Sequence, residues 1–207
     1  MGLPFYNSGV YNSGVYNSGV SNSGVYNGGG GNTITIDGYT YNFVQIGSLY
    51  WITENLIVKA PNAVTYNNGQ LNEYGLYYQP VGDFPIIENK LNDGWRIPTK
   101  NDFLNLYSEC GNNENDFIRD CFNEKYANAQ NLKGLNLLMC GYHSSNSWYL
   151  DNQASLYWTK TIKSGTNYYD LYLRFNGQNV EVDGVFMEDS TSGTGNYRAP
   201  VRICKDV

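Results

Sequence analysis

Hydrophobic and polar residues alternate along the stretch that begins at Asn32, and the alternation is interrupted twice by turn dipeptides. The segment TITIDGYTYNFVQIGSLYWITENL is broken at Asp37-Gly38 and again at Gly47-Ser48. A period of two is typical of strands, and Asp-Gly between two such runs is a strong hairpin signal. The pattern therefore predicts an antiparallel meander of three strands, over residues 33–37, 40–46 and 49–53.

Two helices are predicted in the middle of the chain. In GWRIPTKNDFLNLYSEC, Thr99 is placed to cap a helix at its start. The apolar face of this helix is formed by Phe103, Leu104, Leu106 and Tyr107. Gly111 ends it. A second, shorter helix is expected from Asn113 to Lys125, with one apolar side formed by Phe117, Ile118 and Cys121.

The C-terminal third returns to the pattern of strands. Within it, Asn176-Gly177 is a further hairpin signal. One more short strand is expected earlier in the chain, before the helices, at Leu76–Tyr78. Later strands are expected over residues 156–162, 168–175, 180–186 and 197–204. The order of strands, helices and strands predicts an α+β domain whose first and last strands share a sheet.

Residues 1–31 differ in composition from the rest and form a separate unit. YNSGV is repeated almost verbatim from Tyr6, and the unit ends in the glycines 28–31. Asn-Ser-Gly favours turns, so each repeat is expected to be an apolar Val-Tyr step followed by a turn. An odd period cannot keep one face of a single strand apolar, but it presents apolar pairs to another surface at regular intervals.

The chain is therefore predicted to have an extended N-terminal anchor over residues 1–31 and a folded domain over residues 32–207. A flexible linker is the alternative for the anchor, although its valines and tyrosines distinguish it from a plain Gly/Ser spacer. The predicted interface of the anchor consists of Leu3, Phe5, Tyr6, Val10, Tyr11, Val15, Tyr16, Val20, Val25 and Tyr26.

Composition limits the range of partners. Charged residues make up 15% of the chain, the formal net charge is -6, and no basic run occurs. Nucleic acid and anionic membranes are therefore poor partners. No apolar run approaches the length of a membrane span, and the first residues lack the pattern of a secretory signal, so we expect no export by that route. The 20 tyrosines predict a polar-aromatic surface of the kind found in binding loops.

The sequence contains no evident catalytic or metal-binding constellation, and we predict no enzyme activity, metal or cofactor. His143 is the only histidine, and it lies in the polar loop GYHSSNSWYLDNQ, where it is expected to contact solvent or a ligand. Cys140 and His143 form a C-x-x-H pair, but Cys110 and Cys121 are too far apart to supply a second tight pair for zinc. The carboxylates are scattered, as on solvated faces.

The cysteine count is even, so two disulfides are possible. The residues are Cys110, Cys121, Cys140 and Cys204. Synthesis at a reducing site favours free thiols, and we expect these to be mostly buried. Cys140, in LNLLMC, is expected in a strand of the core.

Five sequence motifs of the body follow the order found in one protein family. The motifs are IDGYTYNFVQIGSLYWITENL, YGLYY, GWRIPTKNDF, YWTKT and APVRICKD. Through them the chain, over roughly residues 34–207, resembles the Fibrobacter succinogenes major paralogous domain family of bacterial surface proteins. The resemblance implies a C-type lectin-like fold with two helices and two small antiparallel sheets. It also implies that Trp51, Trp95 and Trp158 are packing residues.

The chain departs from that family in two respects. Many members have a cysteine just before the Gly-Trp pair, where this chain has residues 91–93, so the resemblance provides Cys204 with no disulfide partner. The tripeptides with which calcium-dependent lectins of this fold bind sugars are also absent, because Gln79-Pro80 is followed by Val81 and no W-N-D occurs. Calcium-dependent sugar binding is therefore not predicted.

In C-type lectin-like folds, the loops between the later strands form the ligand face. By that resemblance, the ligand-facing candidates are Tyr142, His143, Ser145, Asn146, Trp148, Tyr149, Asp151 and Asn152. The loop 188–196 is a second candidate. An ordinary exposed loop is the alternative interpretation of both segments.

These observations lead to three functional hypotheses. The first is a phage virion fibre or decoration protein, on head or tail, that is held to capsid or tail proteins by residues 1–31. It would form a homo-oligomer such as a trimer and use the lectin-like domain to adhere to a glycan or protein of the host surface. The alternative is an adhesion protein of the same family on a bacterial cell surface. An enzyme that acts on glycans is the third and least supported hypothesis.

Overall fold

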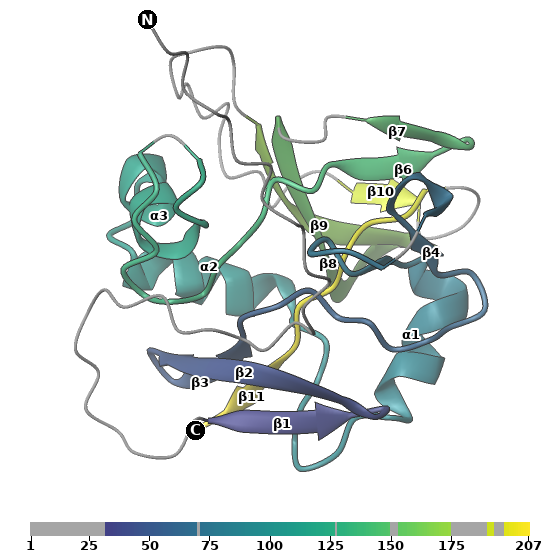
Figure 1. The fold of residues 1–207 in the computed structure, drawn as a ribbon, viewed down its shortest axis with the longest axis horizontal. Helices are drawn as coiled ribbons and strands as arrows, with labels where there is room; N and C mark the ends of the chain where they lie inside the picture. Colours follow the sequence, from purple (N-terminus) through teal and green to yellow (C-terminus); the bar gives the residue numbers. More distant parts are fainter. Residues whose placement is uncertain (1–31, 70, 127, 150–152, 175–189, 193–196) are drawn as a thin grey trace, which may run out of the picture.

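The computed structural model describes residues 32–69, 71–126, 128–149, 153–174, 190–192 and 197–207. These residues form a mixed structure with three helices and several small antiparallel sheets (Figure 1), which confirms the α+β class. The anchor over 1–31, the strand over 180–186 and the Asn176-Gly177 turn lie outside the described residues.

The predicted meander forms the first sheet, together with the C-terminal strand. Its members are β1 (Thr33–Ile36), β2 (Tyr39–Ile46), β3 (Leu49–Ile52) and β11 (Cys204–Asp206). Their order is β1-β2-β3-β11, which confirms that strands from the two ends of the domain share one sheet. Asp37 and Gly38 both have positive φ, at 50° and 83°, as the two-residue turn between β1 and β2 requires.

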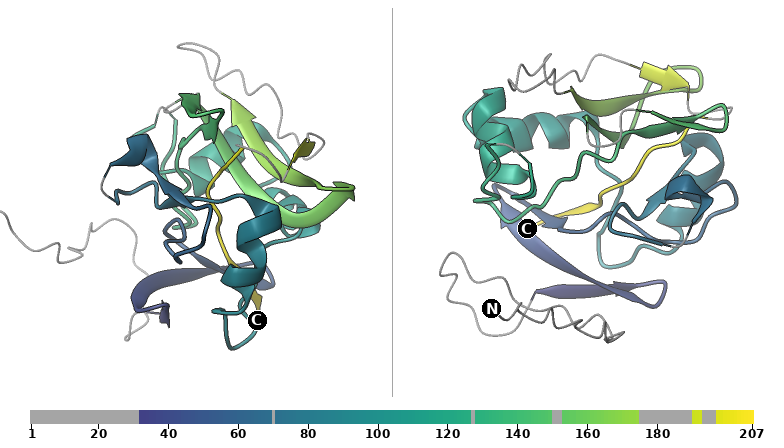
Figure 2. Two further views of the ribbon diagram at one scale, coloured as in Figure 1. Left: turned by 90° about the vertical axis from the view of Figure 1, so that its right-hand side faces the viewer. Right: turned by 45° about the horizontal axis from the view of Figure 1, so that its top comes forward.

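A second sheet is built on a long hairpin. It contains β8 (Ala154–Ser164), β9 (Asn167–Arg174) and β10 (Ser190–Ser192) in the order β10-β9-β8. Two further pairs are small: β4 (Val64–Thr65) with β5 (Leu76–Tyr77), and β6 (Tyr142–Ser144) with β7 (Ser147–Tyr149). A short 3-10 turn, Tyr66–Asn68, follows β4. Figure 2 shows the separation of the two larger sheets.

The two predicted helices are α2 (Lys100–Glu109) and α3 (Glu114–Cys121). Thr99 caps α2 as predicted: its hydroxyl accepts from the Asp102 amide, and the Asp102 carboxylate accepts from the Thr99 amide. Leu104 was placed wrongly on the apolar face, because its side chain is 39% exposed.

The second helix ends earlier than predicted, at Cys121 rather than Lys125. Phe122 has extended backbone angles, and it pairs with Leu137 in a parallel bridge. The Phe122 side chain is buried beside the helix, so a tertiary contact sets this boundary where the local pattern would continue.

A third helix, α1 (Pro80–Glu88), was not predicted, so the expectation of two helices is wrong. Gly82 and Pro85 in its sequence are typical of loops. The helix forms because Pro80 occupies its first position, and because the buried Asp83 carboxylate accepts hydrogen bonds from the amides of Gln79, at 2.8 Å, and Asn62, at 2.9 Å. Phe84 then packs against Tyr168 of β9, with ring centroids 5.6 Å apart.

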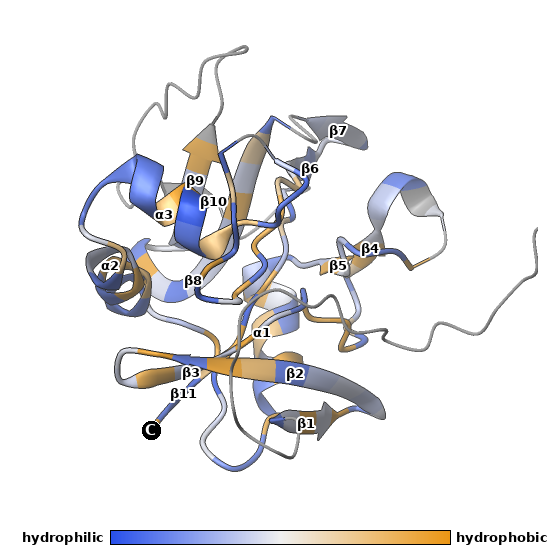
Figure 3. Cartoon of the chain, turned by 60° about the vertical axis from the view of Figure 1, so that its left-hand side comes forward, coloured by the Kyte–Doolittle hydropathy of each residue, from blue (hydrophilic) through white to orange (hydrophobic). Residues whose placement is uncertain are grey.

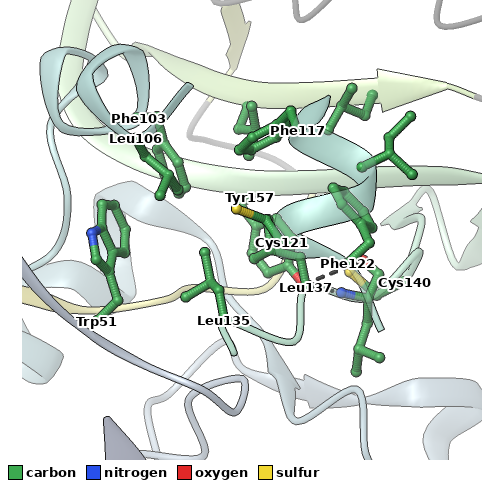
Figure 4. Packing of buried hydrophobic residues seen from close by; sticks show 14 of the residues in the cluster. Trp51, Phe103, Leu106, Phe117, Cys121, Phe122, Leu135, Leu137, Cys140 and Tyr157 are labelled. Atoms are coloured by element: carbon green, nitrogen blue, oxygen red, sulfur yellow. Dashed lines mark hydrogen bonds between the residues drawn. The ribbon is translucent and has the colours of Figure 1, made fainter. Parts of the chain in front are cut away.

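The core consists of two clusters, and single strands contribute to both. Trp51 of β3 and Tyr157 of β8 lie in the first cluster, with Phe103 of α2 and Phe117 of α3 (Figure 4). The next residues along these strands, Ile52 and Trp158, lie in the second cluster, with Phe84 of α1 and others. Successive residues of a strand point to opposite faces, so β3 and β8 are covered on both sides. Figure 3 shows orange, hydrophobic residues along β3, β8 and β9 and on part of β2.

Several expectations about single residues can now be compared with this core. Trp51 and Trp158 are fully buried and Trp95 is 7% exposed, so all three tryptophans are packing residues as expected. All four cysteines are free and buried, also as expected. Cys140 lies in the core but not in a strand, because it precedes β6.

The C-terminal segment 198–206 runs between the two sheets and hydrogen-bonds to most other parts of the fold (Figure 1). Its backbone pairs in turn with His143, Tyr78, Trp158, Leu56, Ile52, Arg96 and Trp51. We predicted one strand over 197–204, but the regular strand is only β11. The upstream residues form single bridges or hydrogen bonds with several segments, so no one neighbour provides a ladder.

Arg202 is fully buried in this segment. Its guanidinium donates to the Asn55 side-chain oxygen at 2.7 Å, and to the carbonyl oxygens of Ile52, Leu135 and Asn136 at 3.0, 3.1 and 2.8 Å. Among the described residues it forms no ion pair with a carboxylate. Neutral oxygens therefore stabilise this buried charge, and they join three separate stretches of chain.

We expect Arg202→Met to lower the free energy of unfolding by about 3 kcal/mol or more, because it leaves several buried oxygens without donors. Lys125→Met is the control: it removes an ion pair to Glu73 whose side chains are 35% and 55% exposed, and should cost less than about 1 kcal/mol. Urea unfolding of both variants measures the difference. Equal losses would contradict the central role of Arg202.

Arg96 explains the spacing of the GWRIPTKND motif. Its guanidinium contacts both carboxylate oxygens of Asp102, at 2.5 and 3.0 Å, and one of Asp206, at 3.1 Å. The same Asp102 carboxylate accepts hydrogen bonds from the amide and hydroxyl of Thr99 at the start of α2. Because Asp206 lies in β11, Arg96 connects the start of this helix to the C-terminal strand. Burial by itself would raise the pKa of Asp102, but the hydrogen bonds from Arg96 and Thr99 outweigh it and hold this pKa below its ordinary value of 3.8.

The lowered pKa predicts that the Asp102 interactions stabilise the fold above pH 3.8 and that this stabilisation is lost as the pH falls through the folded-state pKa. We expect Asp102→Asn to be less stable than the wild type at pH 5 to 7, with a difference that shrinks below about pH 4. Urea unfolding of the two proteins across this range is the measurement. A difference that stays constant or grows on acidification would contradict the prediction.

Candidate functional site

The predicted ligand loop is a β-hairpin. Strands β6 and β7 pair in the register Tyr142↔Tyr149, His143↔Trp148 and Ser144↔Ser147. The two turn residues, Ser145 and Asn146, have φ of 47° and 65°. Two-residue hairpin turns with positive φ at both positions suit the twist of the strands, and Asn tolerates this conformation well.

One face of the hairpin packs onto the body. The Trp148 ring makes edge contacts with His143, Tyr66 and Tyr77, at centroid distances of 4.8, 4.9 and 4.7 Å. Tyr77 is fully buried, and its hydroxyl donates to the Cys140 carbonyl oxygen at 2.6 Å. Burial raises the pKa of Tyr77 far above its ordinary value, so the hydroxyl stays a donor at any physiological pH.

His143 is only 4% exposed. Its backbone pairs with Arg198 through two hydrogen bonds of 2.9 and 2.8 Å, and its Nδ1 lies 3.5 Å from the Arg198 guanidinium. The expectation that His143 contacts solvent or a ligand is therefore wrong, because its ring is enclosed between Trp148 and the C-terminal segment. Trp148 is half-buried and fixes the hairpin with one side of its ring system.

The opposite face of the hairpin carries a column of three stacked tyrosines, Tyr149, Tyr142 and Tyr197. The Tyr149 and Tyr142 rings are 5.2 Å apart and inclined by 15°, and the Tyr142 and Tyr197 rings are 4.7 Å apart and inclined by 20°. Tyr149 is 41% exposed, whereas Tyr142 and Tyr197 are half-buried. The tyrosine column thus begins in solvent and ends against Trp158, whose ring is 5.7 Å from that of Tyr197.

Exposed polar side chains lie on the same hairpin as the tyrosine column. Ser145, Asn146 and Ser147 are exposed at the turn end of the same hairpin, and Ser147 lies two residues before Tyr149 on β7. Hydroxyl and amide groups donate and accept hydrogen bonds, and a tyrosine ring offers a flat apolar face. This combination suits a ligand that has both hydroxyl groups and an apolar face, such as a sugar ring.

The structure brings most of the predicted ligand residues together on one hairpin, but it divides them between two faces. Tyr142, Ser145, Asn146 and Tyr149 remain on or beside the outer surface, while Asp151 and Asn152 lie outside the described residues. Within the second loop, 188–196, only β10 is described. Tyr197 was not predicted, because it is distant in sequence from the hairpin and only the fold stacks it on Tyr142.

The described residues also line two cavities away from the hairpin. One, of about 250 Å³, lies between β2 and the loops at 53–57, 71–73 and 136–138. Its two carboxylates are already engaged, Glu54 by Asn42 and Glu73 by Lys125. The other, of about 120 Å³, lies between β3 and α2. Neither places a histidine or a cysteine beside these acids.

Within the part of the chain that the structure describes, no group of three or more His, Cys, Asp or Glu side chains could hold a metal ion. No helix in that part is long and apolar enough to cross a membrane. Comparisons of the chain with family models, with curated proteins and with solved structures find no match. The residues and their geometry therefore carry the functional proposal.

We expect Trp148→Ala to lower the free energy of unfolding by about 2 kcal/mol, because it removes three aromatic contacts that hold the hairpin. Tyr149→Ala is the matched control on the same strand, and should cost about 1 kcal/mol or less, since Tyr149 is exposed and contacts one ring. Urea unfolding with near-ultraviolet circular dichroism measures both effects. A larger loss for Tyr149→Ala would contradict the assignment of the two faces.

Proposed function

We propose that this protein is an adhesion protein of a phage virion, a fibre or decoration protein whose folded domain binds a host-surface glycan through the outer face of the β6–β7 hairpin. Residues 1–31 hold the protein to capsid or tail proteins, and several copies, as in a homotrimer, act together. The observation that carries the binding proposal is the stacked column of Tyr149, Tyr142 and Tyr197, open to solvent at one end.

The fold supports a C-type lectin-like domain of the Fibrobacter succinogenes major paralogous domain family. Strands from both ends of the domain pair in one sheet, and a second small sheet follows the helices. The motif residues Trp51 and Trp158 are buried in the core, and Arg96 joins the start of α2 to β11. The additional helix α1 is a departure from the two helices that the resemblance implies.

The tyrosine column supports weak, multivalent adhesion. Tyrosine offers a large contact area with few rotatable bonds, so a surface of stacked rings loses little conformational entropy on binding. One sugar ring on one exposed tyrosine binds weakly, but linked copies raise the overall affinity without new contacts. The Val-Tyr repeats of residues 1–31 fit such an assembly, because they offer apolar pairs to a supporting protein at regular spacing.

We expect the full chain, displayed in several copies, to bind glycans or intact cells of a bacterial host. Tyr149→Ala should weaken this binding about three- to tenfold per site, because it removes the exposed stacking surface. Leu132→Ala is the control, since Leu132 is 53% exposed in the loop after α3. Glycan arrays and cell-binding titrations measure the change. Equal binding by Tyr149→Ala and the wild type would contradict the proposed site.

The location of the protein is tested separately. The virion proposal predicts that mass spectrometry detects the protein in purified phage particles, and that a particle reconstruction places residues 1–31 against other virion proteins. Detection only in the surface fraction of uninfected bacteria would favour the alternative, a bacterial surface adhesion protein. Turnover of a glycan by the purified protein would contradict both the virion proposal and the surface-adhesion alternative, and would show that the protein is an enzyme.

A further inference from the structure

Two of the four cysteines lie in contact. The sulfur atoms of Cys110 and Cys121 are 3.3 Å apart, and both residues are buried, with exposures of 2% and 0%. Cys110 is the C-cap of α2, and Cys121 is the last residue of α3. The contact therefore joins the C-terminal ends of two consecutive helices.

The packing around the two sulfur atoms keeps them together. Phe117 and Phe122 lie in the same cluster as both cysteines, and their rings contact each other edge to face at 5.9 Å (Figure 4). The helices are connected by a tight turn in which Gly111 and Asn112 have φ of 88° and 56°. Both turn residues are exposed, so this short connection is the point at which solvent comes closest to the pair.

The other two cysteines have no such neighbour. The Cys140 sulfur lies 4.0 Å from the Leu156 carbonyl oxygen, and the Cys204 sulfur lies 3.2 Å from the Arg96 guanidinium. Both residues are fully buried. The chain thus contains one preformed cysteine pair and two isolated thiols that serve as internal controls.

We propose that Cys110 and Cys121 are an oxidisable pair, which forms an intramolecular disulfide when the folded protein meets a low-molecular-weight disulfide such as oxidised glutathione. A disulfide needs its sulfur atoms about 2.05 Å apart, so the observed contact must close by only a little over 1 Å. This closure is of the size that side-chain rotation provides. The pair can thus be joined without separating the two helices.

The exchange proceeds in two balanced steps. The Cys110 thiolate attacks one sulfur of the small disulfide, which expels one small thiol and leaves a mixed disulfide on Cys110. The Cys121 thiolate then attacks the Cys110 sulfur and expels the second small thiol. Two protein thiols are oxidised and one small disulfide is reduced to two thiols, which carry away the two protons.

The surroundings make the reduced pair slow to react and the oxidised pair stable. The hydrogen bond with Cys110, together with burial, raises the pKa of Cys121 well above its ordinary value, so little thiolate forms at neutral pH. Attack by Cys110 on the small disulfide requires local opening of the exposed turn at 111–112. The disulfide closes a short loop, and such closure restricts the unfolded chain and raises stability.

The test uses the full chain, purified in reductant and then incubated, folded, with oxidised glutathione. Free thiols are alkylated after unfolding and counted by mass spectrometry, and the linked peptides are identified without reduction. We expect the number of free thiols to fall from four to two, with one disulfide between Cys110 and Cys121. The midpoint of thermal unfolding should rise by several degrees on oxidation and return to its original value on reduction.

Three variants sharpen the result. Cys110→Ala and Cys121→Ala should each keep all three remaining thiols, whereas Cys140→Ala should fall from three to one. The number of free thiols in the wild-type protein is measured without any variant. The proposal therefore remains testable even if a substitution destabilises the core. Four free thiols after incubation, a disulfide that involves Cys140 or Cys204, or a lower thermal midpoint on oxidation would each overturn it.

Discussion

The buried guanidinium of Arg202 is the interaction on which the arrangement of this domain depends. A charge in the interior needs compensating dipoles, and here it takes them from Asn55, Ile52, Leu135 and Asn136 rather than from a carboxylate. The Leu135 and Asn136 carbonyl groups lie in a loop with no regular structure, and the Ile52 carbonyl lies at the end of β3, so these backbone oxygens need donors from elsewhere in the fold. The same bonds therefore satisfy the charge and hold the loops against the C-terminal segment.

That segment also positions the proposed binding surface. Arg198 pairs with His143 and holds the base of the β6–β7 hairpin, and Tyr197, one residue earlier, extends the column of Tyr142 and Tyr149. The inner face of the hairpin is anchored through Trp148. The outer tyrosines can face solvent because this inner anchoring holds the hairpin in place. Stability and proposed adhesion are thus divided between the two faces of one small hairpin.

Local patterns predicted much of the fold, and the failures have physical causes. The turn at Asp37-Gly38, the capping box of Thr99 and the long hairpin depend on neighbouring residues, so the sequence reveals them. Helix α1 escaped detection because its start is stabilised by a contact between Asp83 and the distant Asn62. For the candidate site, the family resemblance and the polar-aromatic composition located the loop. They could not show that it forms a hairpin or which of its faces meets the body.

The sequence by itself determined the α+β class, the first sheet, the capped helix α2 and the position of a polar-aromatic loop. These features rest on periodicity and turn chemistry, which act over a few residues. Only the tertiary structure decided that His143 is buried, that Tyr197 completes the tyrosine column, that Cys110 meets Cys121, and that Arg202 lies among neutral oxygens. Each of these features depends on which segments, distant in sequence, pack against one another in the close-packed interior. Local sequence patterns do not determine that packing.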